Sequence, residues 1–210
     1  MTTPLLQFEN LAKRYGDHVL FSGLRYSAGA GCVALSDETV GKSTLLDILG
    51  GARQADAGKV WVNGSPLPAT PNAVAPMLAY IPDDCMLFPM QTGRAFLEQV
   101  ATYRETALDT HTLDVADRFD LTQHLDKRFE QMSRGARKKM FLTAACLGAP
   151  AVIIADEPSA GLDAPGRSVL IDLFTTLAKD RLVFFASYDE ALKSACHPKV
   201  VDFSDFEMRS

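Results

Sequence analysis

Short apolar runs separated by turn residues mark the first part of the chain, up to residue 64. They cover residues 5–8, 19–21, 24–26, 32–35 and 59–62, and Asn63-Gly64 closes the last run. Runs of this length between turn signals are typical of β-strands. The pattern therefore predicts a strand-rich opening.

The pattern becomes helical after residue 41. Apolar residues follow at helical spacing over residues 45–49, and Gly50-Gly51 ends this run. A second helical period extends over residues 92–145, where turn residues are few. We expect a short helix in the first stretch and a helical insertion over about residues 84–145.

The second half of the chain alternates strands and helices. Residues 151–155 form a continuous apolar run of strand length, as expected for a central strand covered on both faces. A helical pattern over residues 167–177 and another apolar run over residues 182–187 follow. This alternation predicts an α/β fold with a parallel sheet.

The composition is that of a globular protein. The 210 residues are 47% hydrophobic and 22% charged, which predicts a single domain over residues 1–210 with one core and an inserted subdomain. The net charge of −5 argues against a protein that grips nucleic acid through a basic surface. We therefore expect no nucleic-acid partner.

Neither a membrane span nor secretion is expected. The longest mostly apolar stretch, residues 141–155, is shorter than the roughly 20 residues of a spanning helix, and Gly148 and Pro150 interrupt it. The first residues show no signal-peptide pattern. The cysteines have neither zinc spacing nor the pattern of a disulfide framework, and we expect ordinary small core residues at Cys32, Cys85, Cys146 and Cys196.

The tripeptide Gly41-Lys42-Ser43 has the form of the end of a phosphate-binding loop. In the motif G-x-x-x-x-G-K-[ST], backbone N–H groups at a helix N-terminus hold phosphate oxygens, the lysine reaches the β/γ-phosphates, and the hydroxyl ligates Mg²⁺. Taken alone, the tripeptide is weak evidence for such a loop, and a helix cap is the simpler interpretation. Ser36 replaces the first glycine of the motif, and Asp37 and Glu38 stand where a polyanion would dock.

Asp156 and Glu157 supply the second half of the same chemistry. They follow a buried run directly, which places them at the C-terminal edge of a parallel strand, where open α/β sheets bind ligands. There Asp156 would hold Mg²⁺, directly or through water, and Glu157 would orient or deprotonate the attacking water. An isolated Asp-Glu-Pro triplet would more simply be a surface turn, but the strand and the phosphate loop favour the catalytic interpretation.

With these motifs in order, the chain resembles, nearly end to end, the ATP-binding cassette (ABC) subunit of ABC transporters. Residues 36–43 resemble the family's Walker A motif and residues 152–157 its Walker B motif. The run DEPSAGLD, residues 156–163, is very similar to the Walker B and D-loop run and is the most specific match. Residues 132–136 correspond to the L-S-G-G-Q signature, and residues 56–60 to a D-x-G-x-V turn.

The resemblance implies a P-loop NTPase core of mainly parallel sheet, with an N-terminal antiparallel β part and an inserted helical subdomain. It also implies ATP and Mg²⁺ as cofactors, with adenine stacked on Tyr15 and catalytic positions at Asp156, Glu157 and Tyr188. Ser133 and Gly135 would act in trans on the γ-phosphate held by a partner cassette. Mg²⁺ would be held by Ser43, Asp83 and Asp156, and the phosphates by Asp37, Glu38, Thr39, Val40, Gly41, Lys42, Ser43 and Thr44.

Several of these residues have simpler explanations when taken singly. Tyr15 would be a half-buried strand residue and Ser133 a helix cap, and a basic run such as residues 137–139 is typical of a solvated helix face. The ordered spacing of the motifs favours the nucleotide site.

The chain departs from the family pattern at functional positions. Asp83 replaces the family's glutamine with a carboxylate that still binds metal but has a shorter reach, and Tyr188 replaces a histidine whose imidazole proton it lacks. In the phosphate loop, Ser36, Thr39 and Val40 replace small or glycine residues, and a positive φ is costly for a β-branched side chain. These changes predict weaker nucleotide binding and reduced hydrolysis.

Two functions from different classes follow. The first is an ATP-binding subunit with weakened hydrolysis that works with a separate membrane permease, as a homodimer or as a heterodimer with a second cassette. It would be cytoplasmic and peripheral, on the cytoplasmic face of the inner membrane. The second is a hydrolysis-deficient, nucleotide-gated scaffold or regulatory subunit paired with an active cassette. A soluble cassette of the DNA-repair or translation type is disfavoured, because the chain has one cassette, no long coiled-coil insertion and no basic arm.

Overall fold

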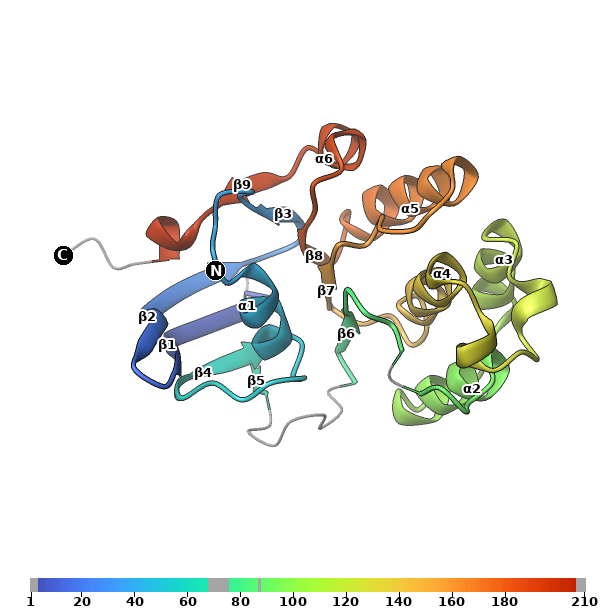
Figure 1. Cartoon of the computed structure of the whole chain (residues 1–210), viewed down its shortest axis with the longest axis horizontal. Coiled ribbons are helices and arrows are strands. Elements are labelled where there is room, and N and C mark those ends of the chain that lie inside the picture. The colour runs from blue at the N-terminus through green and yellow to red at the C-terminus, as the bar shows by residue number, and fades with distance from the viewer. Residues whose placement is uncertain (1–3, 68–75, 87, 207–210) are drawn as a thin grey trace.

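The computed structural model describes residues 4–67, 76–86 and 88–206, and its strands form two sheets (Figure 1). The antiparallel sheet contains β1 (Leu6–Tyr15), β2 (His18–Ala28), β4 (Ala57–Val62) and β5 (Ser65–Pro66), in the order β2-β1-β4-β5. The parallel sheet contains β3 (Gly31–Leu35), β6 (Leu78–Ile81), β7 (Val152–Asp156), β8 (Leu182–Ala186) and β9 (Lys199–Val201). Its strand order is β6-β7-β8-β3-β9.

The central strands of the parallel sheet are buried on both faces. Every residue of β7 and β8 is buried, as their continuous apolar runs predict. Because successive side chains point to opposite faces, Ile154 and Phe184 join one core cluster while Ile153 and Phe185 join the other. The sheet therefore separates two hydrophobic cores.

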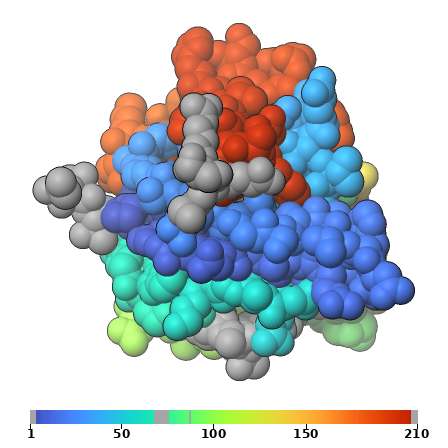
Figure 2. All heavy atoms as spheres, turned by 90° about the vertical axis from the view of Figure 1, so that its left-hand side faces the viewer, coloured from blue at the N-terminus to red at the C-terminus, as the bar shows by residue number. Residues whose placement is uncertain are grey.

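Helix α1 (Lys42–Leu49) lies between the two sheets. Its Leu45 and Leu46 share a core cluster with Leu6 and Phe8 of β1 and with Phe184 of β8. Figure 2 shows the outer side of the antiparallel sheet, where the blue and cyan N-terminal strands lie below the red C-terminal segment. Packing on both sides of α1 fixes the direction in which its N-terminus points.

The remaining long helices cover the other face of the parallel sheet, away from the antiparallel sheet (Figure 1). Three of them occur between β6 and β7 in the sequence, together with two short 3₁₀ helices. These elements are α2 (Gly93–Tyr103), α3 (Thr110–Arg118), η1 (Thr122–His124), η2 (Phe129–Gln131) and α4 (Arg134–Ala144). Helices α5 (Ala164–Leu177) and α6 (Glu190–Cys196) follow later strands, whereas the short 3₁₀ helix η3 (Phe203–Phe206) lies on the side of the antiparallel sheet, where Phe206 packs against Phe8. That residues 84–145 fold as a separate subdomain stays a prediction.

The parallel sheet, its helices and the N-terminal antiparallel sheet confirm the predicted fold class. The early strands are longer than the apolar runs indicate, because β2 continues through Gly23 at a φ of 73° and its pairing with β1 contains register shifts. All four cysteines are free thiols, with Cys85 and Cys146 buried. No helix in the described ranges has the length and hydropathy of a membrane span.

Candidate functional site

The C-terminal ends of neighbouring parallel strands meet at one edge of the sheet. The strand order places β6, β7, β8 and β3 side by side. The segments that follow them are Pro82-Asp83, Glu157, Ser187-Tyr188 and the loop 36–41 that leads into α1. These segments, widely separated in sequence, therefore lie at the same edge, where sheets of this type bind ligands.

The loop 36–41, here called the phosphate loop, presents unpaired donors. Gly41 adopts a φ of 92° at the N-cap of α1, a conformation that favours glycine. The Leu45 amide donates to the Gly41 carbonyl at 3.0 Å, but within the described residues the amides of residues 41–44 find no backbone acceptor. Thr39 Oγ1 is also buried without a partner in that part of the chain. Such an open set of donors suits a phosphate group.

The Lys42 ammonium lies within this loop. Its side chain is nearly buried, and Nζ donates to the Asp37 carbonyl oxygen at 3.3 Å. Nζ also lies 4.2 Å from the centroid of the Tyr188 ring. Tyr188 is 64% exposed, so an exposed aromatic ring covers the ammonium that the motif assigns to the phosphates.

Lys193 pairs with Asp37 of the phosphate loop. Lys193 Nζ lies 2.8 Å from Asp37 Oδ2, and this hydrogen bond raises the pKa of Lys193. The carboxylate next to the expected phosphates is therefore neutralised by a lysine from α6. Sequence reasoning missed Lys193, because nothing in the local pattern connects it with a residue 156 positions away.

Asp156 and Ser43 come together at the end of β7. Asp156 is buried, which raises the pKa of its carboxyl group, and the Ser43 hydroxyl opposes that shift. Within the described residues, no group of three His, Cys, Asp or Glu side chains could hold a metal ion. A Mg²⁺ ion is commonly bound by one or two carboxylates together with substrate phosphates. The donor set of Ser43 and Asp156 fits a metal that arrives with a nucleotide.

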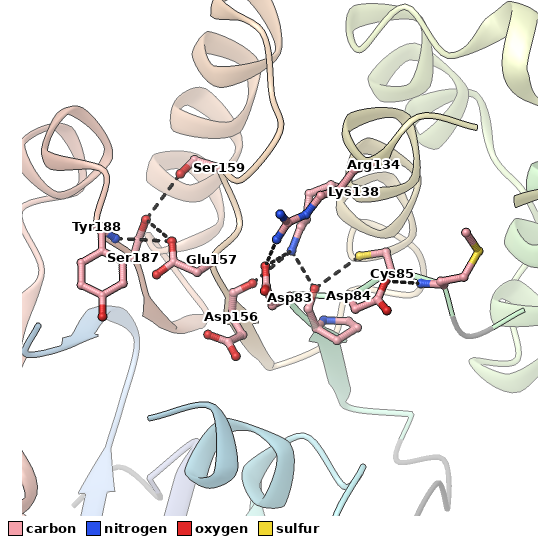
Figure 3. A network of polar contacts seen from close by, with 12 residues as sticks. Asp83, Asp84, Cys85, Arg134, Lys138, Asp156, Glu157, Ser159, Ser187 and Tyr188 are labelled. Atoms are coloured by element: carbon pink, nitrogen blue, oxygen red, sulfur yellow. Dashed lines mark hydrogen bonds and ion pairs between the residues drawn. The ribbon is translucent and has the colours of Figure 1, made fainter. Parts of the chain in front are cut away.

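Glu157 is held in an unusual backbone conformation. Its φ is 44°, and its amide donates to the Ala186 carbonyl at 3.0 Å. Glu157 Oε2 accepts hydrogen bonds from the Tyr188 amide at 3.4 Å and from Ser187 Oγ at 3.5 Å (Figure 3). Burial raises the pKa of this carboxyl group. A left-handed non-glycine residue with an oriented, partly buried carboxylate is typical of a functional site.

Tyr15 lies beside the first turn of α1. Its hydroxyl is 3.4 Å from Thr44 Oγ1, and 46% of the residue is exposed. Tyr15 is thus an exposed aromatic residue next to the phosphate loop, and its stacking on adenine stays a prediction.

Asp83 is bound by two cations from α4. Arg134 Nη2 lies 2.6 Å and Lys138 Nζ 3.9 Å from Asp83 Oδ1 (Figure 3). Lys138 also donates to the carbonyl oxygens of Pro82 at 2.7 Å and Asp156 at 3.1 Å. The ends of β6 and β7 are thereby joined to α4.

The solvated-face interpretation of residues 137–139 is wrong for Lys138. Its side chain is fully buried, and burial lowers the pKa of its ammonium group. The helical position of Lys138 faces the sheet, where two backbone carbonyls replace water as acceptors. Sequence reasoning also missed the contact of Arg134, a residue that the motif resemblance aligns with a glycine of the signature.

The signature segment begins α4. Ser133 Oγ accepts a hydrogen bond from the Ala136 amide at 3.1 Å, so the serine caps the helix. At Gly135, a Cβ would collide with the Gly161 carbonyl oxygen. Within the described residues, no hydrogen bond or ion pair joins Ser133 or Gly135 to the phosphate loop. Both residues line a depression of about 210 Å³ together with Lys139.

The fold and the loop at this sheet edge define an α/β protein of the P-loop class. The profile of the family described as ABC transporter matches residues 37–160, more than half of the chain. The chain therefore belongs to the ABC transporter family, as an ATP-binding cassette, and the resemblance carried by the motifs is confirmed.

Known relatives agree with this assignment. The chain is 27% identical over 194 residues to the Nod factor export ATP-binding protein I of Burkholderia orbicola, and 23% identical over 199 residues to the linearmycin resistance ATP-binding protein LnrL of Bacillus subtilis. These matches cover 90% and 91% of this chain. The chain spans 64% of the length of each relative.

A solved cassette shows the same fold. It is a dimeric ATP-binding cassette in a post-hydrolysis state, bound to ADP and Pi. The two chains superpose with a TM-score of 0.76 at 16% identity, over 98% of this chain and 97% of the other. At this identity the likeness supports the fold, while the site residues stay predictions.

Proposed function

We propose that this chain binds ATP with Mg²⁺ and serves as the ATP-binding subunit of an ABC export system, with hydrolysis slower than that of an ordinary cassette. One observation carries the proposal. The open amides of the phosphate loop and the Lys42 ammonium lie at the same sheet edge as Asp156 and Glu157. A triphosphate held at the loop would reach both carboxylates.

Nucleotide binding uses groups that are already in place. Tyr15 would stack on adenine, and the amides of residues 41–44 would donate to phosphate oxygens. When ATP binds, the Lys42 ammonium would leave the Asp37 carbonyl oxygen and the Tyr188 ring, and would contact the β- and γ-phosphates instead. The Ser43 hydroxyl and the Asp156 carboxylate would hold Mg²⁺, which neutralises phosphate charge when it is bound.

Hydrolysis would depend on Glu157. Its carboxylate is fixed by the Ser187 hydroxyl and the Tyr188 amide, so it can orient a water molecule and accept its proton. Tyr188 has no imidazole to contact the γ-phosphate in the transition state. We therefore expect ATP binding to survive better than turnover.

The proposal includes two partners. ATP binding and hydrolysis by this chain would be coupled to a separate membrane permease, at the cytoplasmic face of a membrane. A second cassette, identical or different, would place its signature segment against the phosphate loop of this chain. The export function is supported by the name of the Burkholderia relative, and the pairing by the dimeric solved cassette.

A second candidate is a nucleotide-gated regulatory subunit without turnover, paired with an active cassette. The Tyr188 ring over Lys42 favours this regulatory candidate. Tyr188 would stand in place of the family's histidine, and its ring would screen the Lys42 ammonium from the phosphates. The two candidates share ATP binding, and they differ in the rate of hydrolysis and in the need for an active partner cassette.

Calorimetric titration of the purified chain with ATP, with and without Mg²⁺, followed by a phosphate-release assay on the same sample, tests both candidates. Lys42→Ala should weaken ATP binding by about ten-fold or more, the loss of a hydrogen bond to a charged group. Lys179→Ala, which removes an exposed lysine after α5, is the control. Equal affinity in wild type and Lys42→Ala would overturn the phosphate-loop assignment.

A further inference from the structure

Two of the cysteines lie near the same end of the strand pair formed by β3 and β9. These strands are neighbours in the parallel sheet, and α6 leads into β9 (Figure 1). Val33 of β3 stands opposite Lys199 of β9, and Cys32 directly precedes Val33. Cys196 is the last residue of α6 and comes shortly before Lys199. The register therefore brings together two cysteines that are far apart in the sequence.

Both cysteine side chains lie on the same face of the parallel sheet. Val33 and Leu35 belong to the core cluster on the side of α1. Ala34 belongs to the cluster on the side of α5 and α6, and Cys32 and Cys196 both pack against that cluster. The Cys196 thiol donates a hydrogen bond to the Cys32 sulfur. The two sulfur atoms therefore face each other.

The four thiols differ in how readily they should react. Cys32 and Cys196 are half-buried, whereas Cys85 and Cys146 are buried. Burial raises the pKa of Cys85 to about 12 and that of Cys146 to about 11. The hydrogen bond from Cys196 instead lowers the pKa of Cys32. Because the thiolate is the nucleophile, Cys32 is the thiol that we expect to react first.

The helix that carries Cys196 is lightly packed. Of the residues of α6, all of which the structure describes, only Leu192 is buried. The next residue, Lys193, pairs with Asp37 of the phosphate loop at 2.8 Å. A covalent bond from Cys196 to β3 would therefore restrain both the helix and the lysine that faces the phosphate loop.

We propose that Cys32 and Cys196 form a reversible intramolecular disulfide when the folded chain meets a low-molecular-weight disulfide such as oxidised glutathione. The Cys32 thiolate attacks one sulfur of the reagent, which gives a mixed disulfide and releases one small thiol. The Cys196 thiolate then attacks the Cys32 sulfur and releases the second small thiol. The two cysteines lose two electrons and two protons in total, and the reagent gains them as two thiols.

The consequence for the fold is that the end of α6 becomes fixed on β3. A reducing dithiol such as dithiothreitol would reverse the bond by the same exchange chemistry. This inference goes beyond the proposed function and does not depend on it, because neither the reaction nor its effect on α6 requires a nucleotide.

The first test treats the folded chain with oxidised glutathione, alkylates the remaining thiols and analyses intact protein and tryptic peptides by mass spectrometry. The chain should lose two of its four free thiols, with the peptides of Cys32 and Cys196 joined within one chain. Dithiothreitol should restore all four thiols. The double variant Cys85→Ala with Cys146→Ala is the control, and it should form the same bond. A chain that keeps four thiols, joins a different pair or links to a second chain overturns the proposal.

Two single variants assign the roles of the two thiols. Cys196→Ser leaves Cys32 without a second thiol, so the reaction should stop with one glutathione bound. Cys32→Ser leaves Cys196, whose pKa is raised by burial, so it should take up glutathione about ten-fold more slowly or less. Melting temperatures show that both variants are folded. Equal rates in the two variants would overturn Cys32 as the attacking thiol.

Amide hydrogen exchange measures the effect on α6. Amides of residues 190–197 should exchange about ten-fold or more slowly in the disulfide form than in the reduced form, because the bond restrains opening of the helix. The amides of α3, which carries neither cysteine, are the internal reference. Cys196→Ser treated in the same way should show no slowing. Equal exchange in the two forms overturns the effect on α6, whereas a failure to bind ATP would overturn the proposed function alone.

Discussion

The Lys42 ammonium lies 4.2 Å from the centroid of the Tyr188 ring, so the phosphate-loop lysine already has an aromatic partner. A cation over a ring face is attracted by the π-electrons, by about 0.5–1 kcal/mol at exposed sites. The motif resemblance predicts that Tyr188 takes the position of the family's switch histidine. Such a substitution would remove an imidazole and add a competitor for Lys42.

Shortening Tyr188 should improve ATP binding. Tyr188→Ala removes the ring, and we expect ATP affinity to rise by about two- to five-fold, the equivalent of one exposed cation–π contact. Tyr188→Phe keeps the ring and should bind ATP as the wild type does. Calorimetric titration checks both, with Tyr103→Ala as the control at another exposed tyrosine. Weaker binding in Tyr188→Ala would show that the ring assists the nucleotide instead of competing with it.

Lys193 should matter for ATP binding although it is far from the motifs in sequence. Lys193→Ala removes the nearer of the two lysines that face the Asp37 carboxylate, and leaves only Lys42 Nζ, 4.0 Å from Asp37 Oδ1. Like-charge repulsion should then weaken ATP binding by about three- to ten-fold, the effect of a charge a few ångströms away at the protein surface. Titration of Lys193→Ala against wild type gives this number.

The double variant Asp37→Asn with Lys193→Ala is the control for that experiment. It removes the repelling charge together with its partner, so ATP affinity should return close to the wild-type value. A double variant as weak as Lys193→Ala would mean that Lys193 acts by some route other than Asp37.

Much of the fold could be predicted from hydropathy patterns. The buried runs of β7 and β8 and the helical spacing after Lys42 are local signals, and Asp156 at the end of β7 identifies the functional edge of the sheet. The length of β2 could not be predicted in the same way. Gly23 interrupts its apolar pattern and is a turn signal in sequence, but the paired strand β1 carries the ladder past it.

The polar contacts of the candidate site were less accessible from sequence. Asp37 with Lys193 and Asp83 with Arg134 are pairs between distant segments, and their partners are set by how α4 and α6 dock on the sheet. Lys138 shows the same limit, because a lysine in a basic run carries no sign of which helix face is buried. The motifs predicted that the phosphate loop and the ends of the strands would lie together, but not which lysine or arginine would pair with Asp37 and Asp83.

The N-cap of α3 should make the free energy of unfolding depend on pH in the acid range. The Asp109 carboxylate accepts from the Thr112 amide at 2.8 Å and from the Thr112 hydroxyl at 2.6 Å, and these bonds hold the pKa of Asp109 below its ordinary value. A carboxyl whose pKa is depressed by folding stabilises the protein above the unfolded-state pKa. That contribution is lost as the pH falls through the folded-state pKa.

Asp109→Ala should therefore lower the free energy of unfolding by about 1 kcal/mol near neutral pH, the usual cost of a lost N-cap. The difference from wild type should shrink below about pH 4, where the unfolded-state carboxyl becomes protonated. Urea unfolding at several pH values measures it, and Asp114→Ala, an exposed residue of the same helix, is the control. A difference that stays constant down to pH 3 would contradict the role of the charged cap.

Turnover should be the property that the departures from the family affect most. Asp156 and Glu157 can hold metal and water, but the γ-phosphate lacks the histidine contact. A group that acts mainly in the transition state lowers kcat more than it weakens binding when it is lost. We expect a rate below about 1 s⁻¹, the lower end of the usual range for phosphoryl-transfer enzymes, in a phosphate-release assay at saturating ATP.

Restoring the family's residues should then raise kcat in a non-additive way. Tyr188→His supplies the missing imidazole and frees Lys42 from the ring, so it should give the larger single gain. Asp83→Gln restores the family's amide but also removes the partner of Arg134, so its effect combines a change at the metal with a change in the signature segment. Because both substitutions act on one nucleotide, their effects should not sum. A wild-type rate within about 1–100 s⁻¹ would refute the weakened site, and a double variant that binds ATP without turnover would favour the regulatory subunit.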